Sequence, residues 1–306
     1  MRREVVFGGL IVAGALSIAI GAAQQPGGAQ PMVIEVQKLK DNLYMFGGGG
    51  GNTAVFVQSN GVTVVDTKNP GWGQPILTKI KELTNKPVTT IINTHSHGDH
   101  VSGNVEFPAT VDIVAHEKTL ANMKAWRPVT SIPQVRENVI AQNGGKGLPK
   151  RTFKDKLTIG SGADQIDLMY FGRGHTDGDA WVLFPMLRVM HAGDIFSAKG
   201  VPLLDYNNGG SGAEIADSLM KAYNATSKNV DSIITGHSTV MTPADLREYV
   251  DYNRDFLSAV REGKKAGKSP ADIAKAWTNP AKYKGYATPP AERLLINIEN
   301  IYKEIK

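Results

Sequence analysis

The stretch from Val88 to His100 constrains the fold more than any other part of this 306-residue chain. Its first five residues, VTTII, are apolar or β-branched and predict a buried strand. That strand runs directly into the eight residues NTHSHGDH, which contain three of the chain's seven histidines. The fold must therefore place the end of a buried strand where several imidazoles and a carboxylate can meet further polar groups.

The spacing inside this stretch suggests two half-sites. His95 and His97 are two residues apart, so their side chains project the same way from an extended backbone and can hold one metal ion. Gly98 allows the chain to turn, so Asp99 and His100 can point to a second location. Zinc takes about four ligands, and with no cysteine in the chain they must be imidazoles or carboxylates. Further ligands must come from elsewhere.

Three later residues are good candidates for these ligands. His175 in GRGHTDGD, Asp194 in HAGD and His237 in GHS each follow an apolar strand and have a glycine beside them. An α/β sheet presents its functional residues at such strand ends. A lone histidine after a strand is most often a hydrogen-bonded structural residue, and a lone Gly-Asp is usually a turn. Because these features occur together with NTHSHGDH, they predict a metal centre.

The surrounding pattern predicts a layered α/β architecture. A helix is expected over Gln74–Thr84, and the glycines of 47–51 are expected to form a flexible hairpin loop, since no Gly-Lys-Ser/Thr follows them. Strands are expected at 32–39, 43–46, 53–58, 62–66, 88–92, 111–115, 165–171, 181–184, 188–191 and 231–235. Strands that alternate with helices favour an α/β fold.

The remaining segments divide into an irregular part and a helical part. Residues 124–153 are poorly periodic and rich in Pro, Gly and Asn, so they are a candidate lid. The last third is expected to be helical. Thr242 and Ser269 each start a helix with a hydroxyl cap, a proline at the next position and an aspartate three residues on.

These motifs resemble those of the metallo-β-lactamase superfamily. THSHGDH is similar to its His-X-His-X-Asp-His signature, GHT, GD and GH follow in the same order, and Asp66 matches its first motif. The resemblance covers roughly residues 33–260. It implies a single-domain αβ/βα four-layer sandwich with a two-metal site at one edge. It also implies that His95, His97 and His175 hold one ion, that Asp99, His100 and His237 hold the other, and that Asp194 bridges both.

Three other polar residues are expected to support these ligands. His116 follows a predicted strand and His191 lies three residues before Asp194, and both are interpreted as structural residues or as residues behind the ligands. Asp66 is expected to orient a ligand.

The expected chemistry is hydrolysis by two divalent metal ions, most simply Zn²⁺, with Mn²⁺, Mg²⁺ or Fe as alternatives. A hydroxide that bridges the two ions would attack a carbonyl, and Asp99 would orient it and accept its proton. Asp194 stands where the best-known zinc β-lactamases have a cysteine, which resembles glyoxalase II, lactonases and nucleases instead. The GRGHTDGDAWVLFP stretch, however, resembles exported β-lactamase-like members.

The favoured substrate is therefore a small cyclic amide or ester, such as a β-lactam or a lactone, with broad specificity. A thioester hydrolase of glyoxalase II type and a phosphodiesterase or nuclease remain as alternatives. Tyr206, Asn207 and Asn208 follow the Asp194 strand and are candidate substrate contacts. Packing is the alternative role for each of them.

The N-terminus predicts export. Arg2 and Arg3 precede an apolar run of small residues, and residues 1–29 are interpreted as a cleaved signal peptide and linker, with an uncleaved membrane anchor as the alternative. This leaves 30–306 as a periplasmic or secreted hydrolase domain with a helical C-terminal extension and no stable membrane span. The formal charge of +5 is spread over the chain without a nucleic-acid-binding motif, so a small-molecule substrate is favoured over nucleic acid.

Overall fold

The computed structural model describes residues 32–132 and 137–306. The predicted signal peptide and linker, residues 1–29, lie outside these described residues. No helix among the described residues is long and apolar enough to cross a membrane. Residues 32–306 form one compact unit.

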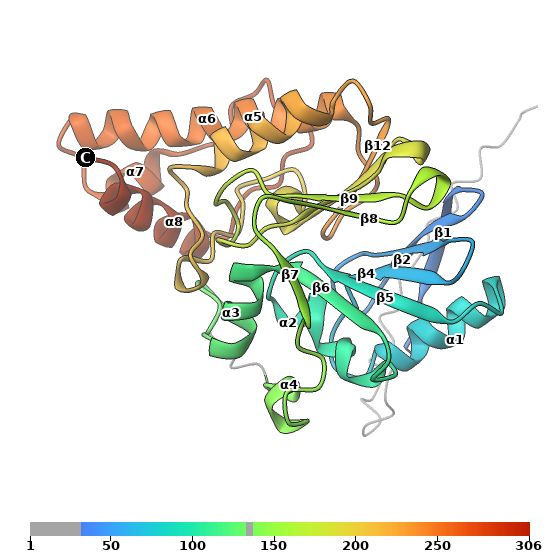
Figure 1. The fold of residues 1–306 in the computed structure, drawn as a ribbon. Helices are drawn as coiled ribbons and strands as arrows, with labels where there is room; N and C mark the ends of the chain where they lie inside the picture. Colours follow the sequence, from blue (N-terminus) through green and yellow to red (C-terminus); the bar gives the residue numbers. More distant parts are fainter. Residues whose placement is uncertain (1–31, 133–136) are drawn as a thin grey trace, which may run out of the picture. The chain divides into compact units, whose positions relative to one another are not determined.

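Two sheets face each other in this unit (Figure 1). The seven-stranded sheet has the order β1-β2-β3-β4-β5-β6-β7. Its strands are β1 Glu35–Lys40, β2 Leu43–Gly47, β3 Thr53–Val57, β4 Val62–Val65, β5 Val88–Asn93, β6 Asp112–His116 and β7 Arg151–Phe153. The first four strands pair antiparallel, and β4 to β7 pair parallel. The sheet is therefore mixed, and one of its parallel strands, β5, leads directly into the histidine-rich stretch.

The second sheet has five strands in the order β12-β11-β10-β9-β8. They are β8 Lys156–Ile159, β9 Ile166–Met169, β10 Trp181–Phe184, β11 Val189–Gly193 and β12 Ser232–Thr235. Only β11 and β12 pair in parallel within this sheet. Because they are parallel, their carboxyl ends lie at the same edge, and Asp194 and His237 follow directly.

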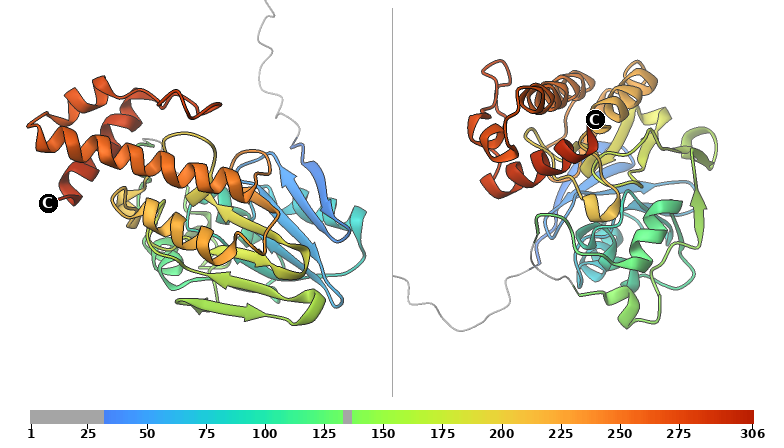
Figure 2. Two further views of the ribbon diagram at one scale, coloured as in Figure 1. Left: turned by 90° about the horizontal axis from the view of Figure 1, so that it is seen from above. Right: turned by 90° about the vertical axis from the view of Figure 1, so that its left-hand side faces the viewer.

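Helices cover the outer faces of both sheets (Figures 1 and 2). The α-helices are α1 Gly73–Leu83, α2 Gly98–Val101, α3 Glu117–Ala125, α4 Val139–Gln142, α5 Ile215–Thr226, α6 Pro243–Lys265, α7 Pro270–Ala276 and α8 Ala291–Glu304. In the described part of the chain, short 3₁₀ helices span Ser102–Glu106, Gly162–Asp164, Pro185–Leu187, Asp194–Phe196 and Tyr206–Asn208.

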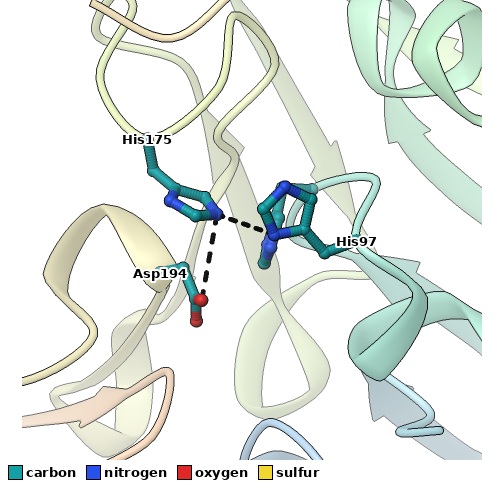
Figure 3. Close-up of side chains that lie close together, drawn as sticks. His97, His175 and Asp194 are labelled. Atoms are coloured by element: carbon teal, nitrogen blue, oxygen red, sulfur yellow. Dashed lines mark hydrogen bonds and ion pairs between the residues drawn. The ribbon is translucent and has the colours of Figure 1, made fainter. Parts of the chain in front are cut away.

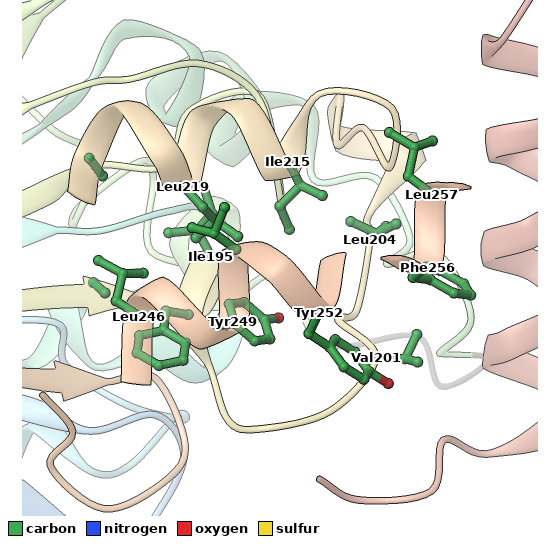
Figure 4. Packing of buried hydrophobic residues seen from close by; sticks show 14 of the residues in the cluster. Ile195, Val201, Leu204, Ile215, Leu219, Leu246, Tyr249, Tyr252, Phe256 and Leu257 are labelled. Atoms are coloured by element: carbon green, nitrogen blue, oxygen red, sulfur yellow. The ribbon is translucent and has the colours of Figure 1, made fainter. Parts of the chain in front are cut away.

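Three buried apolar clusters separate four layers. One joins the two sheets, through residues such as Phe56 and Phe184, whose rings meet edge-on at 5.2 Å. A second packs α1 against the seven-stranded sheet. The third packs the C-terminal helices against the five-stranded sheet, with Leu219 and Tyr249 among its members (Figure 4). The expected four-layer αβ/βα sandwich is confirmed, because each sheet buries one face on the other sheet and one on helices.

Most expected elements are present, and the differences have local reasons. The helix expected over 74–84 is α1, and the capping boxes at Thr242 and Ser269 are both formed. The segment 124–153 is less irregular than expected, since it contains α4 and β7. Both are short, at four and three residues, so they leave no periodic pattern in the sequence.

The glycine run joins β2 to β3 as an antiparallel hairpin, as expected. It is packed closely rather than left open. A side chain at Gly49 would collide with the ring of Trp72, and one at Gly51 would collide with the imidazole of His100. Only glycine therefore allows this loop to lie directly against the histidine-rich stretch.

Candidate metal centre

The predicted ligands meet at the edge where β5, β11 and β12 end. His95, His97, Asp99 and His100 follow β5, Asp194 follows β11, and His237 follows β12. His175 comes from the loop between β9 and β10. Residues separated by up to 142 positions in the sequence are thus brought together by strand ends, which is where an α/β sheet places its site.

The first group consists of His95, His97, His175 and Asp194, all buried, with possible ligand atoms within 4.8 Å of one another. Nδ1 of His97 lies 3.1 Å from Nε2 of His175, which in turn lies 3.8 Å from Oδ2 of Asp194 (Figure 3). Three imidazoles and a carboxylate that converge in this way are a typical ligand set for a divalent transition metal.

The second group consists of Asp99, His100 and His237. Nε2 of His237 lies 3.3 Å from Oδ2 of Asp99 and 3.3 Å from Nε2 of His100. Asp194 touches this group as well, since its carboxylate oxygens lie 3.3 Å from His100 Nε2 and 3.2 Å from His237 Nε2. Asp194 therefore lies between the two groups and can reach both.

His95 and His175 each use the ring nitrogen that points away from the centre to contact a neighbouring residue. Nδ1 of His95 contacts the hydroxyl of Thr94 at 3.0 Å, and Nδ1 of His175 contacts the carbonyl of Leu203 at 2.7 Å. Because a carbonyl only accepts, His175 donates from Nδ1 and keeps Nε2 as a free lone pair. The Nε2 atoms then face the centre.

Carboxylates hold the outer ring nitrogens of two other candidate ligands, His97 and His100. Asp205 Oδ2 lies 2.7 Å from Nε2 of His97, so His97 turns Nδ1 to the centre. Asp66 Oδ2 lies 2.7 Å from Nδ1 of His100, so His100 turns Nε2 to the centre. A carboxylate behind a ligand histidine fixes the tautomer and raises the basicity of the free nitrogen. Asp66 thus orients a candidate ligand, as its position in the sequence suggested, and Asp205 is a second carboxylate that does so.

Two buried ligand atoms give further support for a bound metal ion. Nε2 of His95 is buried and makes no hydrogen bond to any described residue, and the buried Oδ1 of Asp194 has only its ion-pair contact with Nε2 of His100, at 3.3 Å. A buried polar atom without a hydrogen bond costs free energy, and both atoms face the same centre as the remaining ligands. A divalent ion is the group that would satisfy both.

Charge within the centre follows the same division. Burial lowers the pKa of His175 to about 4 and that of His95 well below its usual value. Burial also opposes the charged form of His100, but Asp194 and Asp66 raise its pKa well above the usual value. Asp194 raises the pKa of His237 to about 9. His95 and His175 are therefore neutral at pH 7, whereas carboxylates balance the charge of His100 and His237.

Solvent reaches the centre from one side. The side chain of His237 is 34% exposed and that of Asp99 is 13% exposed, whereas His95, His100 and His175 are buried. A substrate must therefore approach from the side of Asp99 and His237.

The other two histidines are engaged elsewhere. His116 caps α3, accepting from the backbone N–H of Lys118 at Nδ1, and its Nε2 contacts the carbonyl of Lys154. His191 contacts the carbonyl of Asn52 at 3.1 Å and accepts from the backbone N–H of Gly193. Both positions agree with the structural roles expected from the sequence.

The three candidate substrate contacts use their polar atoms within the protein. Nδ2 of Asn207 donates to the carbonyl of Pro128, and Nδ2 of Asn208 donates to Asp205. The hydroxyl of Tyr206 lies 3.5 Å from the carbonyl of Asn297 in α8, so it faces the C-terminal helices. A substrate-binding role for the three stays a prediction; their observed contacts hold the loop that carries Asp205.

Sequence reasoning missed Asp205 and Lys68. Asp205 opens the DYNNGG stretch already noted for its position, so a search for a carboxylate partner to His97 could have found it. Lys68 is fully buried and donates from Nζ to the carbonyls of Phe46 and Gly51, at 2.9 Å and 2.7 Å. These two hydrogen bonds connect the two ends of the glycine loop. A lysine inside a loop sequence gives no signal of burial.

Lys68 should give the protein a measurable pH dependence. Burial lowers its pKa from 10.5 to about 7. Between about pH 7 and pH 10.5, Lys68 is protonated in the unfolded chain and neutral in the folded protein. The free energy of unfolding therefore rises as the pH rises through this range, and this stabilisation is lost as the pH falls to about 7. From pH 7 to pH 9 the free energy of unfolding should rise by roughly 3 kcal/mol more in the wild type than in Lys68→Met.

Denaturant unfolding at a fixed metal concentration measures this difference. The exposed Lys118 provides the control, since Lys118→Met should keep the wild-type pH profile. Parallel profiles for wild type and Lys68→Met would show that Lys68 is not titrating in this range.

Comparison with known proteins agrees with this geometry. The profile of the metallo-beta-lactamase superfamily matches residues 46–237. The chain is 25% identical over 258 residues to "Metallo-beta-lactamase type 2" from Elizabethkingia meningoseptica, covering 78% of this chain and 91% of that protein. It is 28% identical over 164 residues to "Hydroxyacylglutathione hydrolase" from Nostoc punctiforme, covering 54% and 51%.

A solved structure shows the same fold. The metallo-beta-lactamase from Pontibacter korlensis superposes with a TM-score of 0.59 at 19% identity, covering 72% of this chain and 99% of the other. The chain belongs to the metallo-β-lactamase superfamily. It is accordingly a metal-dependent hydrolase with a His/Asp cluster suited to divalent ions.

Proposed function

We propose that the protein hydrolyses a small cyclic amide or ester, of the β-lactam or lactone class, at a centre of two divalent metal ions. One observation carries the two-ion centre: Asp194 lies between two converging ligand groups, and its Oδ2 is 3.8 Å from Nε2 of His175 and 3.2 Å from Nε2 of His237. His95, His97 and His175 would hold one ion, Asp99, His100 and His237 the other, and Asp194 both. Zinc suits this donor set, and the added carboxylate oxygens also suit Mn²⁺, Mg²⁺ or Fe.

The roles of the protein groups follow from their positions. The ions, when bound, would lower the pKa of a water and polarise the substrate carbonyl. Asp99 combines partial exposure with a position 3.3 Å from His237, so its carboxylate can orient the attacking water and accept its proton. Asp66 and Asp205 hold His100 and His97 in the ligand tautomer. The buried imidazoles exclude bulk water from the inner side.

The substrate class rests on the extent of similarity. The β-lactamase relative matches 78% of this chain and the hydroxyacylglutathione hydrolase 54%. The second relative, together with a carboxylate at position 194, supports a thioester hydrolase as the second candidate. Both reactions need a carbonyl electrophile at the same centre.

A substrate panel tests the proposal. The purified, metal-loaded protein is assayed with a chromogenic cephalosporin, an acyl-homoserine lactone, a glutathione thioester and a bis-aryl phosphodiester, each before and after exhaustive chelation. Turnover of a cyclic substrate that chelation abolishes is the expected result. Turnover of the thioester alone would favour the second candidate, and activity that survives chelation would contradict a metal mechanism.

Export is part of the same proposal. Residues 1–29 are proposed as a signal peptide and linker, and 30–306 as the mature hydrolase domain with its helical C-terminal extension. Cell fractionation followed by N-terminal sequencing tests this, and a mature protein that starts at Met1 would contradict cleavage.

A further inference from the structure

His237 is the candidate histidine ligand with the least support behind its ring. The other four contact a neighbouring group through the outer ring nitrogen, and they are His95, His97, His100 and His175. Within the described part of the chain, Nδ1 of His237 makes no such contact. Its side chain is also 34% exposed, whereas the other four imidazoles are buried. The direction of this imidazole therefore depends on the backbone turn that carries it.

The turn that carries His237 is held by Asn52. Asn52 directly precedes β3 in the seven-stranded sheet, whereas the turn follows β12 in the five-stranded sheet (Figure 1). Nδ2 of Asn52 donates to the carbonyls of Thr235 and Ser238, at 2.9 Å and 2.8 Å. Its backbone N–H donates to the carbonyl of Gly236 at 2.7 Å. One residue of the first sheet thus contacts three carbonyls on both sides of a ligand from the second sheet.

The position of this turn determines the geometry of the second ligand group. Nε2 of His237 lies 3.2 Å from Oδ2 of Asp194 and 3.3 Å from Oδ2 of Asp99. The turn also packs directly against the proposed bridging carboxylate, since a Cβ at Gly236 would lie 1.9 Å from Oδ1 of Asp194. A displacement of the turn therefore changes the distances between His237 and both carboxylates.

The residue before Asn52 contacts the rest of the second ligand group. The backbone N–H of Gly51 donates to the carbonyl of Asp99 at 3.0 Å, and a side chain at Gly51 would collide with the imidazole of His100. Two consecutive residues therefore contact Asp99 and His100 on one side and the turn of His237 on the other. They join the parts of the second group that come from different sheets.

We propose that Asn52 is a positioning residue for the second metal ion: its side-chain amide fixes the turn of His237, and thereby the distance of that imidazole from Asp99 and His100. An amide suits this role because its two N–H groups can donate to two carbonyls at once. Asn52 is only 8% exposed, so water competes little for these carbonyls. The inference rests on the two-ion centre of the proposed function and adds to it a residue outside the ligand set.

Metal binding in the absence of substrate tests the proposal. Zn²⁺ is titrated into the wild type, Asn52→Ala and Asn52→Ser in competition with a chromogenic chelator, which resolves the two dissociation constants. Asp66→Asn identifies the constant of the second ion, because it changes the partner of His100. Asn52→Ala should weaken this constant by about 10- to 100-fold and the other by less than about threefold. Asn52→Ser keeps one hydroxyl donor and should show a smaller loss at the same ion.

Asn253→Ala is the matched control. Asn253 is also buried and donates from Nδ2 to a backbone carbonyl, but that carbonyl belongs to Tyr249 within α6. Both metal constants should therefore stay at the wild-type values. Thermal unfolding of the metal-free proteins shows which variants are folded. Asn52→Ala should unfold cooperatively, because it keeps the backbone hydrogen bonds of residue 52 to Gly236 and His191.

The outcomes separate this inference from the proposed function, since no substrate enters the measurement. An unchanged second constant, or equal weakening of both constants, in folded Asn52→Ala would overturn the role of Asn52 and leave the proposed function standing. If Asn52→Ala does not fold, Asn52→Ser decides by the same comparison. A wild type that binds a single ion would overturn the two-ion centre, and this inference with it.

Discussion

Asp194→Asn is expected to lower kcat/KM by about three orders of magnitude or more, equivalent to roughly 4 kcal/mol of transition-state stabilisation. Asp194 is the residue that both ligand groups share, since its Oδ2 lies 3.8 Å from Nε2 of His175 in the first group and 3.2 Å from Nε2 of His237 in the second. An amide has one oxygen and no charge, so it cannot join two ions or balance the second group. Activity on the best panel substrate and the number of metal ions bound per chain measure the effect.

The number of bound ions should fall from two toward one in this variant. Asp217→Asn, on the exposed side of α5, is the matched control and should keep both ions and full activity. If Asp194→Asn retains two ions and wild-type turnover, Asp194 does not bridge the centre.

Asp205→Asn and Asp66→Asn should each weaken metal binding by about 10- to 100-fold, but at different ions. Asp205 holds Nε2 of His97 in the first group, and Asp66 holds Nδ1 of His100 in the second. An asparagine that donates its N–H to these nitrogens would favour the opposite tautomer and place a proton on the nitrogen that should bind metal. Competition with a chromogenic chelator resolves the two dissociation constants.

The pattern of the two losses is the informative result. Each variant should weaken a different one of the two constants. Asp167→Asn is the control, because Asp167 is also buried but bonds to Thr158 in the neighbouring strand. Equal weakening of both constants in Asp66→Asn and Asp205→Asn would mean that the carboxylates act on the fold and not on single ligands.

The fold was predictable where the sequence contains a regular pattern of apolar residues or a helix-capping motif. The strands ending in Asn93 and Thr235 are apolar runs bounded by polar residues, and the capping boxes at Thr242 and Ser269 mark helix starts directly. The short elements β7 and α4 were not expected. Elements of three or four residues are stabilised by neighbouring strands and helices, and they have too few residues to establish a pattern.

The candidate site was predictable to the extent that its residues sit beside glycine at strand ends. Seven candidate ligands are found together as expected, because β5, β11 and β12 end close to one another and the loop between β9 and β10 brings His175 to the same place. Asp205 could not be found in this way, since 108 residues separate it from His97, and pairing across such a distance is set by packing. Lys68 could not be found either, because its partners are backbone carbonyls, which no residue type marks in the sequence.

The sequence by itself thus determined the superfamily, the four-layer architecture and the candidate ligands, because these depend on residue type and on local order along the chain. The tertiary structure decided which nitrogen of each histidine faces the centre, which carboxylates stand behind His97 and His100, and that Lys68 is buried. The physical reason is that tautomers and buried charges depend on neighbours brought together only by folding, and no period or spacing encodes them.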